Sequence, residues 1–407
     1  MSAAVGAQMT SIAEQGPIAY SKTAPTDAVA TLQQQIDAGT VTLAYDEAHG
    51  YLPAVLKALH VPVSSQGLVF SRTSLQVDHI APWTPRAIYF NDDLYVGWVQ
   101  GGPIMEVASA DPTLGAVFYT LAQDKTDRPH FERQTRTCLQ CHDSSSSTGG
   151  VPGFIMRSTI TDRYGYPVLA DTGATTDQTP MEKRWGGWYV TGTLGDPPPP
   201  GPPAGVSRPV GVGHMGNVFV PKLAHEIGNV QSYLSQNRLV SVHDITSLKD
   251  RFDVDPYLSP GSDAVALLVL AHQTSVHNLI TLAGYEARIA GGTLDARAKG
   301  MADRLANAMM LARQAPLAAP VTGTSTFAAD FQAMGPKDPK GRSLRDLDLH
   351  EHVFKYPLSY LIYSDSFNAL PDSVKQYVYG RIRTDAPPDV LQILKDTKPD
   401  VFSNTTP

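Results

Sequence analysis

The two cysteines of the 407-residue chain lie in one five-residue run, Cys138-Leu139-Gln140-Cys141-His142. Two thiols three positions apart can form thioether bonds to the two vinyl groups of one porphyrin, and the adjacent imidazole can ligate its iron. A Cys-x-x-Cys-His run is the attachment signature of haem c. The run therefore predicts one covalently bound haem c, held by Cys138 and Cys141, with His142 as the proximal iron ligand.

Other uses of paired cysteines fit the sequence less well. A structural zinc site needs two further ligands, usually a second cysteine pair or a histidine pair, and the sequence has no such partner. A thioredoxin-like dithiol opens a helix directly after a buried strand, whereas residues 130–137 are polar. A dithiol, a disulfide and coincidence are the alternatives to haem.

Residues that flank the run add candidate contacts to the same group. Arg133 and Arg136 are close enough in sequence to form charge-assisted hydrogen bonds with haem propionates. After His142, this short region resembles small cytochromes c. In that family a proline about ten residues past the histidine packs on the ring, and its carbonyl holds the other imidazole nitrogen. The resemblance assigns this role to Pro152.

Four further segments extend the resemblance over the whole chain. They resemble a family of large bacterial monohaem proteins, cytochrome c-like and uncharacterised, and they lie at 71–76, 85–92, 184–189 and 356–363. The resemblance implies haem and an exported location. It implies no substrate.

Several residues are candidates for the sixth coordination position of the iron. Met215 and His214 lie in a glycine-flanked run, His272 lies on an expected helix, and Met156 is close to the haem segment. A further alternative is that no side chain binds there. Methionine raises the reduction potential of haem iron, whereas a second histidine generally lowers it.

These alternatives separate two functions. A six-coordinate iron predicts an exported monohaem c-type cytochrome that transfers electrons to a redox partner protein, and this is the interpretation we favour. An open position predicts a haem c oxidoreductase, peroxidase-like or acting on another small-molecule substrate. Its catalytic residues are unknown, with His214, His272 and Arg157 as candidates for an acid–base group and a stabilising cation. A haem-bearing sensor is a third class.

Composition excludes several partners. The formal net charge of −7 argues against nucleic acid and against an anionic membrane as the main partner. The best candidate for a membrane span, 264–271, is too short, so no span is expected. A hydrophobic content of 42% is ample for a large core.

The expected location follows from the chemistry, because this type of haem attachment takes place outside the cytoplasm in bacteria. The first residues lack the basic start and the long apolar region of a signal peptide. We therefore expect a periplasmic or secreted protein whose signal peptide is not present in this chain.

The elements that must position these residues form an α+β pattern. The N-terminal half is β-rich and carries the haem segment, and the C-terminal half is mainly helical. We expect a haem c-attachment region at 1–194, a Pro/Gly-rich linker or loop at 195–209, and a helical region at 210–407 that packs on the haem half. Strands are predicted at 87–90, 94–100, 104–109, 116–121, 166–169 and 187–192, and helices at 26–36, 52–59, 263–290, 294–314 (capped by Thr293) and 374–383.

Overall fold

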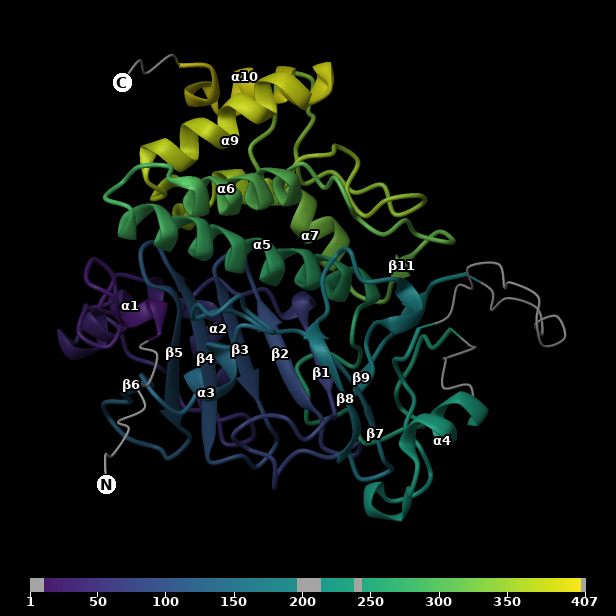
Figure 1. The fold of residues 1–407 in the computed structure, drawn as a ribbon. Coiled ribbons are helices and arrows are strands. Elements are labelled where there is room, and N and C mark those ends of the chain that lie inside the picture. The colour runs from purple at the N-terminus through teal and green to yellow at the C-terminus, as the bar shows by residue number, and fades with distance from the viewer. Residues whose placement is uncertain (1–10, 196–213, 238–243, 404–407) are drawn as a thin grey trace, which may run out of the picture.

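The N-terminal half of the chain forms a seven-stranded antiparallel sheet and the C-terminal half is mainly helical, so the fold class is α+β as predicted. The computed structural model describes residues 11–195, 214–237 and 244–403, which Figure 1 draws as a ribbon. The strand order is β6-β5-β4-β3-β2-β1-β9. The strands are Gly67–Val69 (β1), Arg86–Phe90 (β2), Leu94–Trp98 (β3), Ile104–Asp111 (β4), Gly115–Ala122 (β5), Phe131–Arg133 (β6) and Trp188–Tyr189 (β9).

Compact apolar runs form the central strands β2 to β5 where the sequence predicts them. Each strand pairs with its neighbour in sequence, and Gly101, at φ 67°, lies in the turn between β3 and β4. Of the other two predicted strands, 187–192 supplies β9. The strand predicted at 166–169 is β8, which pairs with β7 beside the main sheet. The remaining strands are Arg157–Thr161 (β7), Pro167–Ala174 (β8), Gly192–Thr193 (β10) and Thr322–Gly323 (β11).

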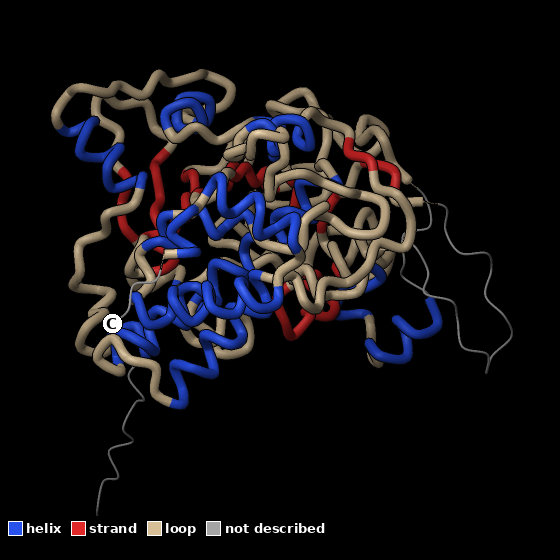
Figure 2. The backbone as a smooth tube through the Cα atoms, turned by 90° about the horizontal axis from the view of Figure 1, so that it is seen from above, coloured by secondary structure: helices blue, strands red, loops and turns tan. Residues whose placement is uncertain are grey.

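Helices cover both faces of the sheet. One face shares a core with α1 and α2, and the other lies under α5, with α6, α9 and α10 stacked beyond it (Figure 1). In the view from above, helices of the C-terminal half lie in front of the strands (Figure 2). The helices are Ala28–Asp37 (α1), Leu52–Ala58 (α2), Leu139–His142 (α3), Val230–Asn237 (α4), Ala264–Ile289 (α5), Ala296–Met309 (α6), Phe327–Ala333 (α7), Asp365–Asn368 (α8), Asp372–Asp385 (α9) and Pro388–Thr397 (α10).

The longest described helix, α5, lies at the centre of the core on the second face of the sheet. The apolar run at 264–271 continues through buried polar residues to make a helix of 26 residues. Among the described residues, α5 is the one helix long and apolar enough to cross a bilayer by length and composition. In its most apolar window, 89% is buried inside the protein, as is typical of a core helix.

The helix that follows α5 starts later than predicted. Asp295, not Thr293, caps α6, because its carboxylate accepts a hydrogen bond from the backbone N–H of Ala298. The helix ends at Met309, two residues before Leu311 adopts φ 54°. Apart from Gly195, the predicted linker lies outside the described residues, so the division of the chain at 195–209 stays a prediction.

Asp263 is the residue on which the start of α5 depends. One carboxylate oxygen accepts from the N–H groups of Val265 and Ala266, and the other accepts from Thr324 and Ser325. Because Asp263→Ala leaves these donors, two of them buried, without their partner, we expect it to lower the free energy of unfolding by about 3 kcal/mol. Denaturant titration measures the loss, and Asp295→Ala, which removes a single helix-cap bond, is the control at about 1 kcal/mol. Equal losses would contradict the prediction.

Candidate functional site

The cysteine–histidine run folds as one helical turn, α3, in the connection between β6 and β7. The backbone N–H of His142 donates to the carbonyl of Cys138 at 3.0 Å, which closes the turn. Because residues three apart lie on the same side of a helix, the two thiols point the same way. Cys141 is exposed and Cys138 is half-buried.

The His142 ring is held in the tautomer that a metal ligand needs. Its Nδ1 lies 2.9 Å from the carbonyl oxygen of Gly153, and because a carbonyl only accepts, Nδ1 carries the proton. The Nε2 lone pair is then available as a ligand. Burial lowers the pKa of His142 to about 4, so the ring is neutral at pH 7.

The carbonyl that orients the ring belongs to Gly153, not to Pro152 as the resemblance to small cytochromes c predicted. The carbonyl of Pro152 accepts from the N–H of Ala116 on β5 instead. Gly153 also donates its N–H to the carbonyl of His142, so the loop closes on the histidine at both groups. A Cβ on Gly153 would lie 2.4 Å from Oδ1 of Asn278, so a side chain does not fit there.

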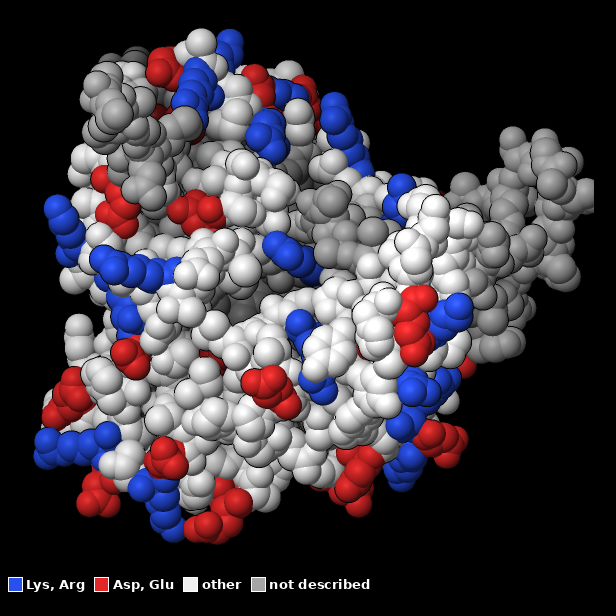
Figure 3. All heavy atoms as spheres, turned by 60° about the horizontal axis from the view of Figure 1, so that its bottom comes forward, with Lys and Arg blue, Asp and Glu red and all other residues white. Residues whose placement is uncertain are grey.

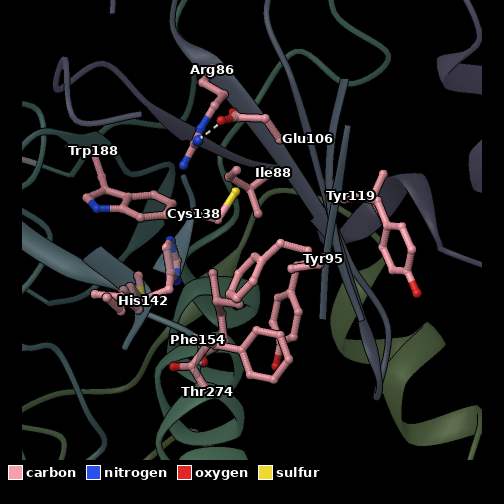
Figure 4. A pocket seen from close by; sticks show the side chains of 17 residues that line it. Arg86, Ile88, Tyr95, Glu106, Tyr119, Cys138, His142, Phe154, Trp188 and Thr274 are labelled. Carbon is pink, nitrogen blue, oxygen red and sulfur yellow. Dashed lines mark hydrogen bonds and ion pairs between the residues drawn. The ribbon is translucent and has the colours of Figure 1, made fainter. Parts of the chain in front are cut away.

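Two adjoining cavities open beside α3. The first has a volume of about 130 Å³ and lies between the sheet and α5 (Figure 4). On the sheet, Gly97 pairs with Ile88 on one neighbouring strand and with Glu106 on the other. Because Gly97 has no side chain, the cavity has room at this position. The second cavity, about 240 Å³, extends past Cys141 toward the surface. Both are lined by Arg86, Glu106, Cys138, His142, Ile155 and Trp188.

A pair of charged side chains stands at the junction of the two cavities. Arg86 and Glu106 form an ion pair at 2.7 Å, opposite His142 in Figure 4. The Nε of Arg86 is buried and has no hydrogen-bond partner among the described residues. Arg157 lines the second cavity and donates to Ser147 at 3.2 Å. The site therefore offers two guanidinium groups to an anionic ligand.

The pKa of the Cys138 thiol is shifted in the opposite direction to that of a redox-active dithiol. Burial, with smaller effects from Glu106 and Cys141, raises its pKa to about 11. Nucleophilic cysteines of dithiol enzymes have a lowered pKa, because the thiolate is the reactive form. A zinc site is also unsupported, since no group of three His, Cys, Asp or Glu side chains gathers in the part of the chain that the structure describes.

The two arginines predicted to meet the propionates do not line either cavity. Arg133 donates to the carbonyls of Tyr20 and Thr23, and its guanidinium lies 5.0 Å from the Tyr20 ring centre. Arg136 is exposed. Arg133 follows the pairing of β6 with β5 and meets the N-terminal segment instead. Arg86 and Arg157 are the arginines that line the cavities.

Three of the four predicted distal ligands are also absent from the walls of the two cavities. Both ring nitrogens of His272 are occupied, Nδ1 by Asp177 at 3.0 Å and Nε2 by Ser359 at 2.8 Å. His214 packs on Trp185, and the sulfur of Met215 lies 3.9 Å from the Ser158 hydroxyl. Of the four candidates, the structure brings only Met156 into the first cavity with His142. Of the three candidate catalytic residues, only Arg157 lines a cavity.

The burial of His214 predicts a pH dependence of the free energy of unfolding. Burial lowers its pKa from 6.5 to about 4, so on acidification the unfolded chain binds a proton first. Stability is therefore lost as pH falls from 6.5 toward 4, and it is fully present above 6.5. Between about pH 7.5 and 5 we expect the advantage of the wild type over His214→Asn to shrink by about 2 kcal/mol. Denaturant unfolding at both pH values measures this difference, and a constant difference would contradict it.

The residues present fit a haem c group. The helical turn carries two thiols, the histidine carries a free Nε2 lone pair, the cavity walls are largely aromatic and aliphatic, and Arg86 has an unpaired buried donor. The sequence analysis did not identify Arg86, Glu106 and Trp188 as site residues. They reach the site through the pairing of strands that lie far apart in the sequence, and no local motif indicates this pairing. Comparisons of the chain with protein-family models, curated proteins and solved structures find no match.

Proposed function

We propose that the chain is an exported monohaem c-type cytochrome that carries electrons through one covalently bound haem c. The observation that carries this proposal is the joint geometry of α3: Cys138 and His142 face a cavity, and the histidine is a neutral Nδ1–H tautomer. Bound haem supplies a one-electron iron couple. The protein holds the group through Cys138 and Cys141, ligates it through His142, and offers Arg86 and Arg157 to its propionates.

The walls of the cavity support a redox role. Tyr95, Phe118, Phe154 and Trp188 line the inner cavity with aromatic rings, and Phe118 packs on His142 with ring centres 4.6 Å apart. Packed, largely apolar walls reorganise little when the charge on a bound group changes. Met156 is the side chain of the inner cavity that could complete a six-coordinate iron.

A second candidate function rests on the ion pair above the histidine. Arg86 and Glu106 place a cation and a carboxylate in the same cavity, the two groups that peroxide chemistry uses to move a proton and stabilise a departing oxygen. An open distal position beside them would make the protein a haem c oxidoreductase. The two functions differ in one measurable property, access of a small ligand to the iron.

Optical spectra separate the two functions. The chain is matured in a bacterial periplasm with haem attachment, and spectra are recorded oxidised and reduced, with and without carbon monoxide. A reduced spectrum that carbon monoxide leaves unchanged supports electron transfer. A prompt shift supports the oxidoreductase. Absence of covalent haem after maturation would overturn both.

A further inference from the structure

Exposed large apolar side chains gather in one area of the surface. Of the nine such side chains among the described residues, five come from two short segments. Leu75, Val77 and Trp83 lie before β2, and Tyr164 and Tyr166 lie in the turn between β7 and β8. Trp83 is 50% exposed and Tyr166 is 48% exposed. We call these five residues the Trp83 patch, and a cluster of this kind marks an interaction surface.

The structure holds the Trp83 patch rigid while leaving it exposed. The rings of Trp83 and Tyr164 meet edge to face with centres 5.9 Å apart. Arg72 donates from Nε to the Tyr164 carbonyl at 3.0 Å and from Nη1 to the Tyr166 hydroxyl at 2.7 Å. Gly165, at φ 88°, approaches the Phe70 carbonyl so closely that a Cβ would lie 2.5 Å from it. A pre-organised aromatic surface loses little entropy when a partner binds.

The patch borders the outer cavity of the candidate haem site. Thr73, Ser74 and Leu75 line this cavity together with Cys141, the exposed cysteine. The same segment continues through Val77 to Trp83. A partner that covers the patch therefore also covers the opening where the attached group would come nearest to solvent.

Two arginines lie against the aromatic rings of the patch. The Arg72 guanidinium lies 4.4 Å from the Tyr166 ring centre, and that of Arg163 lies 5.0 Å from the Tyr164 ring centre. The nearby Asp162 is buried and accepts from the backbone N–H groups of Tyr164 and Tyr166, so it does not face a partner. Within 71–83, Asp78 is the one carboxylate. On the face shown in Figure 3, charges of both signs are spread around uncharged surface.

This composition selects among possible occupants. Trp, Tyr and Arg are the residue types that most often carry the binding energy of protein interfaces. A second copy of the chain docked by a two-fold axis would bring the same positive patch against Arg72 and Arg163, and like charges oppose association. The chain as a whole carries a formal net charge of −7, but Arg72 and Arg163 make this patch locally positive, and an acidic partner would place its carboxylates on these arginines.

We propose that the Trp83 patch is the docking surface for an acidic redox protein, which exchanges one electron with the haem through the opening at Cys141. The inference rests on the proposed function. In the step, one electron leaves the reduced partner, which is oxidised, and ferric iron in the docked protein becomes ferrous.

The test uses reduced plant-type ferredoxin, an acidic iron–sulfur protein, as the electron donor to the haem-loaded protein in stopped-flow measurements. Because rim charges act on the association rate, Arg163→Glu should lower the second-order rate constant roughly tenfold at low ionic strength, with little effect at high salt. Trp83→Ser should lower it by roughly the same factor at both ionic strengths. Reduction by dithionite should be unchanged in every variant, which shows that the haem itself is intact.

Matched controls lie outside the patch and outside the lining of both cavities. Lys299→Glu makes the same charge change on exposed α6, and Met334→Ser removes an exposed apolar side chain after α7. Equal rates for Arg163→Glu and Lys299→Glu, with haem attached, would overturn the docking proposal and leave the proposed function standing. Self-association of the wild type that Trp83→Ser abolishes would also overturn it. Failure to attach haem at all would remove the proposed function, and the docking proposal with it.

Discussion

Replacing either Cys138 or Cys141 by alanine is expected to abolish stable covalent haem. The two thiols are the only ones in the chain, and they lie on one side of the single turn α3. Each thioether forms by addition of S–H across a vinyl group, and we expect that the one remaining thiol does not sustain stable attachment. The measurement is retention of haem absorbance by the polypeptide after acid–acetone extraction, which should fall from nearly complete to none.

The control for this experiment is Gln140→Ala, which alters an exposed residue between the two cysteines and should retain haem fully. Far-ultraviolet circular dichroism of each variant establishes that it is folded. Retention of haem after extraction in both cysteine variants would refute the attachment site, and with it the central proposal.

Replacing His142 by glycine is expected to leave the thioethers and remove the proximal ligand. The variant loses the Nδ1 bond to Gly153 and the ring contact with Phe118, and it opens a hole the size of an imidazole. We expect a changed reduced spectrum and rapid carbon monoxide binding. Added imidazole should restore the wild-type spectrum with an apparent dissociation constant of roughly 1 mM.

Rescue by imidazole separates loss of the ligand from general damage, because a misfolded site would not respond to it. His214→Gly is the matched control, since it makes the same substitution at a buried histidine that packs on Trp185 outside the cavities. Its spectrum should remain that of the wild type. An unchanged spectrum in His142→Gly would show that another residue ligates the iron.

The sequence predicted best where one local pattern decides the structure. The strands β2 to β5 and the helix α5 follow from runs of apolar residues. It predicted least where distant segments meet. The ion pair of Arg86 and Glu106 depends on the pairing of β2, β3 and β4, which no spacing along the chain reports.

Errors at single residues came from the same cause. His272 has the residue type of a haem ligand, but Asp177 and Ser359, far away in sequence, occupy both its ring nitrogens. Pro152 has the spacing of the cytochrome c proline, but pairing with Ala116 takes its carbonyl and leaves the next one for His142. Such competition between partners is decided by tertiary structure alone.

The two hydrogen bonds between the Asn278 side chain and the backbone of Phe154 bear on the order in which the chain folds and acquires haem. Its side-chain amide accepts from the N–H of Phe154 and donates to its carbonyl, across 124 residues of sequence. Under the proposed function the chain is exported, so Cys138 and Cys141 would emerge from the membrane well before Asn278. In the finished fold Cys138 is half-buried and its raised pKa keeps the thiol protonated. Under the proposed function, haem is therefore attached before α5 packs over the sheet. Once folding is complete, the half-buried Cys138 thiol is less accessible for attachment.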